Sequence, residues 1–392
     1  MPKRKTYDKQ FADLSKEIDL KKSKQNVKSS FGDFSDPRVE KRCVYPAWYL
    51  FLIILSGYLA GCNTIADIAH FAEIRAPWFA DLISHKVSGP SYDTIWWFLA
   101  RVSPESFKGL ISRWLSGLPK DLKDQLLVID GKRLKGVSDN EHISHIVELF
   151  ATEGRLVVAQ EKVPDKSGET QALPALLDTI DITGAIVSMD ALYAHVDDVE
   201  EVLKRGADYI VGIKGNQSTL EAELENFFNQ AKTVDYKEVG GISQAETHEE
   251  GHGRLERRWV CVANEIDWLP QKKKWHLESI IEVRSERVIG DKVEQAIRYY
   301  GSSRKADAKQ FAKWIRDHWS IESMHHIMDV VFKEDASLSD IGYSAENMAL
   351  IRRLAANVIR TFDPNRGITD ARRNATYEPN YLRGLLGKMF VK

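Results

Sequence analysis

Two short apolar runs, each ending in an aspartate, constrain the fold of this chain more than any other feature. The first is "QLLVID", which ends at Asp130, and the second is "GAIVSMD", which ends at Asp190. Runs of this length and apolarity are typical of buried strands. Open α/β sheets bind their ligands beyond the carboxyl ends of parallel strands, so both aspartates are placed to reach one site. An aspartate at a strand end can equally be a turn or cap residue, and the pair alone leaves that alternative open.

Residues 120–232, which contain both runs, alternate between strand and helix signals. Strand patterns occur in "QLLVID", "HISHIVELFA" and "RLVVAQEKV", and the turn "TEG" separates the last two. The chain then reads helix, strand, helix, strand, helix. This order resembles an RNase H-like core, in which an antiparallel meander precedes alternating units with parallel strands. We therefore predict the α/β fold class.

The flanking regions have different patterns. Residues 1–31 hold nine Lys/Arg and four Asp/Glu, which predicts a basic polar arm. Residues 32–120 read as helices, because "TIADIAHFAEI" and "SPESFKGLISRWLSGL" carry apolar residues at helical spacing. Strand signals return at about 233–303 and predict a β-rich insertion. The predicted domains are the arm, an N-terminal helical domain for DNA-end binding or dimerisation, a catalytic domain over 121–360 with the insertion, and a basic C-terminal tail over 361–392.

Charge, cysteine content and hydropathy limit the class of protein. The formal net charge of −2 argues against a simple DNA-coating protein but permits an enzyme with carboxylates in its centre and basic residues on one face. The three cysteines form no CxxC pair, which argues against a structural zinc site or disulfides and favours a reducing cytoplasm. The apolar run 47–62 is shorter than the ~20 residues that span a bilayer, so we expect a buried helix and no membrane contact.

A third carboxylate stands in the segment "HWSIESMHHIMDVVFKED" after the predicted insertion. Glu322 lies three residues after Trp319 and four after His318, and His325 and His326 follow it by three and four. Residues at these spacings share one face of a helix. We interpret this stripe as part of the site that Asp130 and Asp190 begin. The alternative is an amphipathic helix with a solvated polar face.

Three carboxylates are enough for two-metal phosphoryl transfer. Two Mg²⁺ ions, for which Mn²⁺ is the expected substitute, can clamp the attacking and leaving oxygens of an in-line displacement. Mg²⁺ is usually held by a few carboxylates together with substrate phosphates. Such a reaction needs no nucleophile from the protein, because water attacks first and a freed 3′-OH attacks second.

Several stretches together resemble the H-repeat-associated insertion-sequence transposases, a branch of the DDE class with an RNase H-like catalytic fold. The resemblance runs from about Phe31 to about Arg360. The stretches that carry it are "DPRVEKRCVY", "LAGCNTIADIAHFA", "PSYDTI", "IDGKRLKG", "DKSGETQALPALLD", "AIVSMDALYAH", "YIVGIKGNQ", "GHGRLERR", "HWSIESMHHIMDVVFKEDAS" and "NMALIRRLAANVIR". Each is moderately specific, and their order adds to their weight.

The resemblance implies a function and a set of catalytic residues. The family's acidic triad falls on Asp130, Asp190 and Glu322, which would also be the metal ligands. The expected activity is metal-dependent cleavage of DNA strands at the element ends and strand transfer into target DNA. Double-stranded DNA is the expected partner, with a homodimer assembled on it in the bacterial nucleoid. A domesticated nuclease and a DNA-binding regulator that keeps the fold remain as alternatives.

Other residues are candidates for DNA contacts or for support of the metal ligands. Lys132 follows Asp130 closely, and "KGNQ" opens a helix, where backbone N–H groups bind phosphate. In "HGRLERR", Arg254, Glu256 and Arg258 alternate along a predicted strand, so their side chains share one face that can contact DNA. Each has an ordinary alternative as a solvated loop, a cap or a polar strand face. The full set is Lys132, Lys166, Lys214, Asn216, Gln217, His252, Arg254, Arg258, His318, Trp319, His325, His326 and Asp329.

Three members of this set have more specific expectations. The histidines are interpreted as phosphate contacts or proton handlers rather than as a zinc cluster. Trp319 is a candidate platform for an unpaired base, with a core residue as the alternative. Many related transposases carry a basic residue about two helical turns after the catalytic glutamate, but here that position is Asp329. It either supports the metal ligands or is an ordinary helix-face residue.

Overall fold

The computed structural model describes residues 29, 31–39, 43–83, 88–117, 122–134, 145–236, 239–251, 254–337 and 341–390. Of the predicted arm over 1–31, only Ser29 and Phe31 belong to these residues, and His252 lies outside them. Phe31 packs on Phe34 and Phe51 and so joins the helical core.

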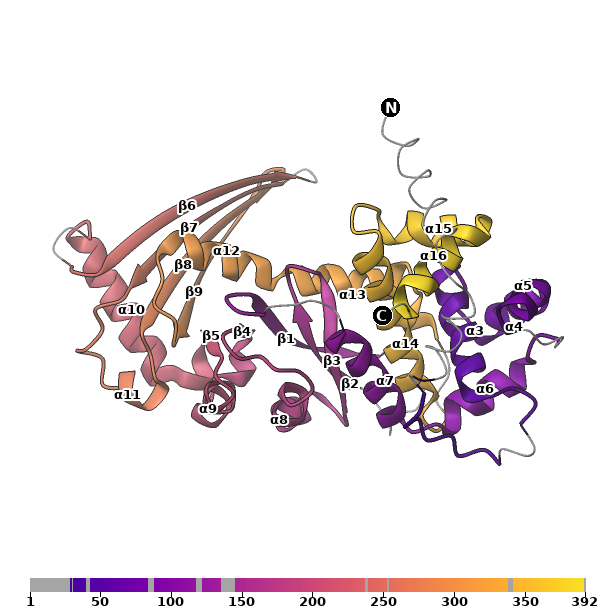
Figure 1. Cartoon of the computed structure of the whole chain (residues 1–392). Coiled ribbons are helices and arrows are strands. Elements are labelled where there is room, and N and C mark those ends of the chain that lie inside the picture. The colour runs from indigo at the N-terminus through magenta and orange to yellow at the C-terminus, as the bar shows by residue number, and fades with distance from the viewer. Residues whose placement is uncertain are drawn as a thin grey trace.

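A single mixed sheet forms the frame of the molecule (Figure 1). Its strand order is β3-β2-β1-β4-β5-β9-β8-β7-β6. The first three strands form an antiparallel meander, and β4 and β5 run parallel to β1. The strand and helix order predicted for residues 120–232 is therefore confirmed. The strands are β1 (Leu126–Arg133), β2 (His145–Ala151), β3 (Leu156–Val163), β4 (Ile186–Met189), β5 (Asp208–Ile213), β6 (Ile242–Gly251), β7 (Arg254–Ala263), β8 (Ser279–Ile289) and β9 (Lys292–Ser302).

Helices cover the sheet and form the other end of the molecule (Figure 1). Beside the sheet lie α8 (Leu173–Leu177), α9 (Val196–Lys204), α10 (Ser218–Thr233), α11 (Lys272–Trp275), α12 (Ala308–His318) and α13 (Ser320–Val330). The helical end contains α3 (Ala47–Leu59), α4 (Ile65–Ile74), α5 (Ala76–Ile83), α6 (Tyr92–Arg101), α7 (Pro104–Ser116), α14 (Ser344–Phe362), α15 (Ile368–Tyr377) and α16 (Pro379–Phe390).

The β-rich insertion continues the central sheet instead of forming a separate layer. Strand β9 pairs with β5, and β8, β7 and β6 follow outward. The sequence indicated β7, β8 and β9 but not β6, whose residues "ISQAETHEEG" are mostly polar. Because β6 is the edge strand, it needs only the free hydrogen-bonding edge of β7 and no apolar face of its own. Figure 1 shows these four strands on the side of the molecule opposite the helical end.

The helical end draws on both ends of the chain. The apolar run 47–62 forms α3, in which all residues from Tyr49 to Leu59 are buried, as predicted. Helix α14 packs against α3, α6 and α7, and also against β3. Asn347 in α14 donates to the carbonyls of Leu99 and Val102, which binds α14 to the end of α6. Residues 32–120 therefore share their core with the C-terminal helices.

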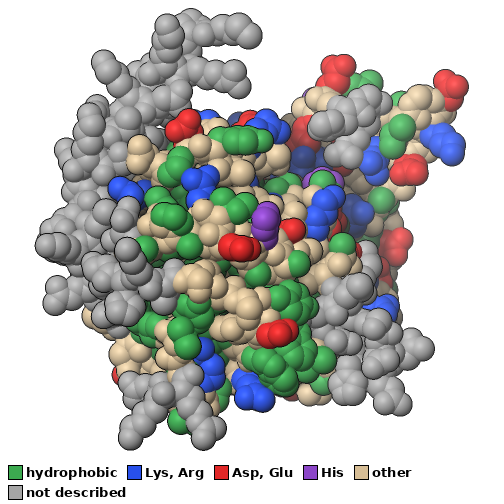
Figure 2. Space-filling view, turned by 90° about the vertical axis from the view of Figure 1, so that its right-hand side faces the viewer, with side chains coloured by type: hydrophobic (Ala, Val, Ile, Leu, Met, Phe, Trp, Pro, Cys, Tyr) green, Lys and Arg blue, Asp and Glu red, His purple; other side chains and the backbone are tan. Residues whose placement is uncertain are grey.

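The C-terminal segment is ordered structure and not the tail predicted over 361–392. Arg372 of α15 is buried and donates to the carbonyls of Tyr58 and Cys62 at the end of α3. Its charge counted toward a basic tail in the sequence, but its guanidinium satisfies helix-end carbonyls inside the protein. Figure 2 looks onto the helical end and shows hydrophobic side chains between scattered charges of both signs. Within the described ranges, no helix combines the length and apolarity needed to cross a membrane.

Candidate active site

Asp130 and Asp190 lie side by side because of strand register. The parallel pairing of β1 with β4 ends with Ile129 opposite Met189, and each aspartate is the next residue. The side chains of residues paired in this way point to the same face of the sheet. Asp190 then turns out of the sheet as the N-cap of the short helix η4 (Ala191–Tyr193), where its carboxylate accepts from the Ala191 N–H.

The position of Asp130 differs from the prediction in one respect. Strand β1 does not end at this residue but continues to Arg133. It can continue because β2 pairs with it over this whole length, from Leu127 to Arg133. Asp130 is therefore at the end of the β1–β4 pairing but in the middle of the β1–β2 pairing, which holds its backbone more rigidly than a loop would.

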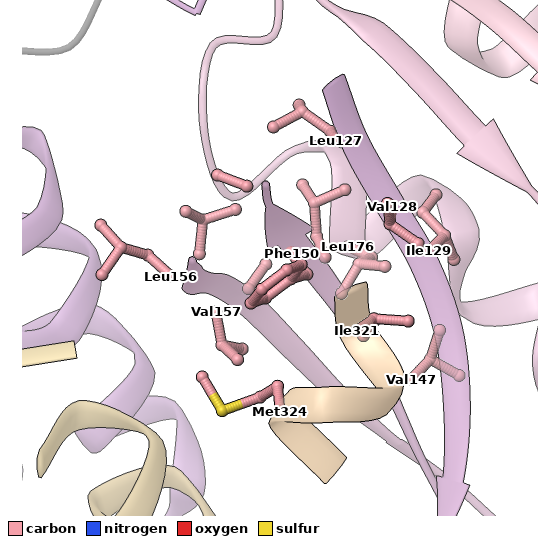
Figure 3. Packing of buried hydrophobic residues seen from close by; sticks show 14 of the residues in the cluster. Leu127, Val128, Ile129, Val147, Phe150, Leu156, Val157, Leu176, Ile321 and Met324 are labelled. Atoms are coloured by element: carbon pink, nitrogen blue, oxygen red, sulfur yellow. The ribbon is translucent and has the colours of Figure 1, made fainter. Parts of the chain in front are cut away.

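Glu322 reaches the same place from a helix. The predicted helical stripe is interrupted at Trp319, which separates α12 from α13. Glu322 then lies in the first turn of α13. Ile321 and Met324 on either side of it are fully buried, and Figure 3 shows both among strand residues such as Val147 and Val157. This packing fixes α13 on the sheet and leaves Glu322 exposed on the other side of the helix.

The three carboxylates line one pocket of about 210 Å³. Its walls come from β1, β4, β5, β9 and the junction of α12 with α13. No three His, Cys, Asp or Glu side chains converge into a closed ligand cluster within the part of the chain described. Mg²⁺ commonly takes only one or two carboxylates directly and completes its octahedron with waters and substrate phosphates. An open set of three carboxylates around a pocket of this size fits that mode of binding.

The environment of Asp130 disfavours its charge. Burial raises its pKa to about 6, while the facing His325 and the Gly131 N–H counteract this and the nearby Glu169 and Glu148 add to it. His325 Nδ1 lies 3.7 Å from Asp130 Oδ2, and His325 Nε2 lies 2.9 Å from Glu148 Oε2. The histidine thus stands between two carboxylates that are cross-strand partners in β1 and β2. A cation that binds Asp130 relieves the penalty that burial imposes.

A buried chain of charges extends from His325 into the core. Glu148 and Glu334 are both fully buried and both bond the guanidinium of Arg353 in α14. Burial alone would raise the pKa of each carboxyl, but Arg353 and the other facing cations hold both pKa values at about 2. Lys132 closes the chain, because its ammonium bonds both Glu334 and Asp329.

Three members of this chain of charges, Glu148, Glu334 and Arg353, were not predicted from the sequence. A signal was present: a glutamate interrupts the apolar strand "HIVELFA", and two arginines interrupt the apolar helix "ALIRRLAANVIR". Charged residues at fully buried positions are rare unless they are paired. The sequence does not reveal their partners, because Glu148 and Arg353 are 205 residues apart.

Gly131 allows a second buried pair to lie against Asp130. His145 Nε2 and Glu169 Oε1 are 2.6 Å apart, and both side chains are nearly inaccessible to solvent. A Cβ atom on Gly131 would come within 2.4 Å of Glu169 Oε1 and 2.6 Å of His145 Nε2. The glycine in "IDGK" is therefore needed for space.

Comparisons with known proteins show the family of this chain. The family model described as "Transposase DDE domain" matches residues 121–358, and the model described as "DDE_Tnp_1-associated" matches residues 28–115. This chain belongs to the DDE transposase family. Its relatives include the H-repeat-associated transposases, as the sequence analysis expected.

Two Escherichia coli relatives illustrate how far the similarity of this DDE transposase family member extends. The chain is 30% identical over 350 residues to "Putative transposase YncI" of strain O157:H7, which covers 86% of this chain and 88% of the relative. It is also 30% identical over 351 residues to "H repeat-associated putative transposase YhhI" of strain K12, with 86% and 91% covered. A piggyBac transposase synaptic complex with hairpin DNA aligns at a TM-score of 0.43 and 10% identity, over 92% of this chain and 78% of that one.

In this DDE family member, the residues of "KGNQ" mainly position the backbone. Lys214 lines the pocket, and its Nζ lies 3.6 Å from Asp190 Oδ1. Asn216 and Gln217 donate to the carbonyls of Ala191 and Ala194 at 2.7 Å each. Their amides therefore hold the segment after Asp190, while the predicted phosphate contact of this helix start stays a prediction.

The residues of the helical stripe separate into different environments. His318 accepts from or donates to Ser188 Oγ at 2.8 Å, and burial lowers its pKa to about 4, so it is neutral at pH 7. His325 faces Asp130, whereas His326 is exposed. Trp319 is partly exposed in the pocket wall. Asp329, further along α13, pairs with Lys132.

Two other candidate DNA contacts are paired with carboxylates. Lys132 is only 7% exposed, and its ammonium pairs with Asp329 and Glu334, which favours the alternative that it supports the metal ligands. Arg258 pairs with Glu249 and Glu256, so its charge is already neutralised. Arg254, Glu256 and Arg258 do alternate along β7, as predicted from the sequence. Lys166 is exposed in the short helix η2 (Lys166–Gly168), and nothing in its surroundings tests its predicted role.

Proposed function

We propose that this protein is an active DNA transposase that cleaves DNA strands at the ends of its element and joins them to target DNA. The observation that carries the proposal is the convergence of Asp130, Asp190 and Glu322 on one pocket from two adjacent strands and one helix. The strand order of β1 to β5 supports an RNase H-like core. Membership of the DDE transposase family supports the reaction class.

The three carboxylates are the proposed ligands of two divalent metal ions, with Mg²⁺ as the natural metal and Mn²⁺ as a substitute. Metal ions bound there would supply the clamp on the attacking and leaving oxygens of the phosphoryl transfer. Asp130 and Asp190 hold fixed positions relative to each other through the β1–β4 register. Glu322 approaches from α13, so any shift of that helix changes the separation of the ligands.

Other residues of the chain hold these ligands and balance their charge. His325 lies between Asp130 and Glu148, 3.7 Å from the first carboxylate and 2.9 Å from the second. Lys214 lies close enough to Asp190 to offset its charge before the substrate binds. Double-stranded DNA is the proposed substrate, and a homodimer on paired element ends is the proposed assembly.

The test is cleavage of labelled DNA that carries the gene's own flanking sequences, with Mg²⁺ or Mn²⁺. We expect metal-dependent nicking at the element ends and its loss in Asp190→Ala. Asp370→Ala is the matched control, because this exposed aspartate forms a surface pair with Arg373. A second labelled duplex then reports strand joining. Cleavage without joining would favour the nuclease alternative, and binding without cleavage in either metal would overturn the proposed activity.

A further inference from the structure

The β insertion contributes a cation to the pocket that holds the three carboxylates. Arg298 of β9 lines this pocket together with Asp190 and Glu322. The sheet register places it there. Ile213 of β5 pairs with Tyr299 of β9, and the next residue along each strand in this direction is Lys214 or Arg298. Two basic side chains, one from the core and one from the insertion, therefore reach the same pocket.

Arg298 differs from the other arginines on its side of the insertion. Arg258 is paired with Glu249 and Glu256, and Arg316 of α12 is also paired with Glu249. Among the residues that the structure describes, no carboxylate lies within 4 Å of the Arg298 guanidinium. Its charge is therefore available for a ligand, unlike the charges of its neighbours.

Trp319 holds this guanidinium over the pocket. The Arg298 guanidinium carbon lies 5.7 Å from the centre of the Trp319 ring, within the range of a cation–π contact. The ring is in turn held edge-on against His318, at 5.6 Å between the ring centres. His318 is fixed by Ser188, so the position of Arg298 is tied to the strand that precedes Asp190.

We infer that Arg298 binds a backbone phosphate of the DNA strand in the pocket, and that Trp319 is the residue that positions it. The inference rests on the proposed function, since it names a contact for that same substrate. A guanidinium suits this task because its fork of N–H donors matches phosphate oxygens. In this arrangement the ring of Trp319 supports an arginine and does not serve as a platform for an unpaired base.

The opposite face of the same sheet offers a matched control. Arg257 of β7 lies 5.6 Å from the ring centre of Trp259, which makes a second Arg–Trp pair. Sheet register places this pair on the other face of the sheet. Val260 pairs with Val283, and Val283 pairs with Arg298, so these three side chains share one face. Arg257 and Trp259 lie an odd number of residues from Val260, so their side chains point to the opposite face. Loss of Arg257 removes the same charge from the insertion but from outside the pocket.

The experiment measures binding of the full-length protein to a labelled duplex of the gene's flanking sequence at several salt concentrations. Ca²⁺ replaces Mg²⁺, and a denaturing gel verifies that the probe stays intact. We expect Arg298→Ala to weaken binding on the order of tenfold at low salt. We also expect it to reduce the slope of log affinity against log salt by about 0.9, which corresponds to one lost phosphate contact. Arg298→Lys keeps the charge and should restore the slope.

The positioning role of Trp319 has its own readout. Trp319→Ala should weaken binding in the same way as Arg298→Ala, and the double variant should bind no worse than either single variant. Trp319→Phe, which keeps an aromatic face, should bind close to the wild type. Melting temperatures of all variants verify that they fold, and Arg298→Gln replaces the alanine variant if that one does not.

The outcomes separate this inference from the proposed function. If wild type binds DNA but Arg298→Ala keeps the wild-type salt slope, the inference is wrong and the proposed function stands. An equal reduction of the salt slope in Arg257→Ala would also overturn the inference. The reduction would then follow from the lower positive charge of the insertion and not from a contact in the pocket. If the wild type binds no DNA at all, the proposed function fails and the inference fails with it.

Discussion

The guanidinium of Arg353 in α14 bonds the carboxylate of Glu148 in β2, and both side chains are fully buried. Glu148 also bonds His325, which faces Asp130, so a helix of the helical end is connected to the pocket through three side chains. Glu334 bonds the other side of the same guanidinium. The core of the molecule thus contains one arginine that keeps two carboxylates ionised.

Replacement of Arg353 should destabilise the protein strongly. In Arg353→Met, Glu148 and Glu334 lose their main cation, and breaking a buried pair in this way costs about 3–5 kcal/mol. Urea unfolding followed by tryptophan fluorescence measures the loss. Arg373→Met is the control, because the Arg373–Asp370 pair is exposed and should contribute less than about 1 kcal/mol. Equal midpoints for the two variants would contradict the role assigned to Arg353.

The same pair predicts how stability depends on acid. The pKa values of Glu148 and Glu334 are about 2 in the folded protein, below the ordinary value of 4.5. Stability from depressed carboxyl pKa values is present above the unfolded pKa and is lost as the pH falls through the folded one. Wild type should therefore lose stability between about pH 4.5 and pH 2. The difference in stability between wild type and Arg353→Met should become smaller over the same pH range. Urea midpoints measured at each pH test this.

Asp130 should behave in the opposite sense. Its pKa is raised to about 6, so the penalty for its charge is absent below its ordinary pKa of 3.8, grows between pH 3.8 and 6, and is complete above pH 6. Asp130→Asn should stabilise the metal-free protein at pH 8 and have no such effect at pH 4. The gain should be about 1 kcal/mol, because the side chain is 35% exposed and solvent screens part of the penalty. Thermal unfolding in EDTA at both pH values measures it, and a gain independent of pH would contradict this account.

Removal of His325 should weaken metal binding without unfolding the protein. The side chain holds the space between Asp130 and Glu148, and loss of such support around a ligand commonly costs about 10- to 100-fold in metal affinity or activity. Calorimetric titration of His325→Ala with Mn²⁺ tests this independently of cleavage. His326→Ala is the control, since this neighbouring histidine on α13 is exposed. Equal affinities for both variants would rule out the supporting role.

A methyl group on Gly131 should disturb the site from the side of the sheet. In Gly131→Ala the new Cβ would collide with Glu169 and His145, so either the pair separates or β1 moves. Overpacking of this kind costs about 1–3 kcal/mol. Gly215→Ala is the matched control, because, apart from its chain neighbours, no atom of the described residues lies within 4 Å of its Cβ position. Thermal unfolding compares the two, and a Gly131→Ala protein as stable as the control would show that the pair can relax at no cost.

The sequence by itself determined the elements that follow from local pattern. The apolar runs before Asp130 and Asp190 gave buried strands, and the run 47–62 gave a buried helix, since burial of apolar side chains depends on their order along the chain. Strand signals over 233–303 indicated the insertion, and family resemblance added the expected triad. The polar edge strand β6 could not be predicted this way, because its partner is what makes it a strand.

Only the tertiary structure decided which charges act on one another. Lys132 looked like a phosphate contact in the sequence, but the fold places its ammonium against Asp329 and Glu334. Arg372 looked like part of a basic tail, but it caps helix ends in the core. Arg298 carried no signal at all, and strand register brings it to the pocket. Pairing of charges depends on distances of a few ångströms between residues far apart in the chain, and local sequence pattern carries no record of those distances.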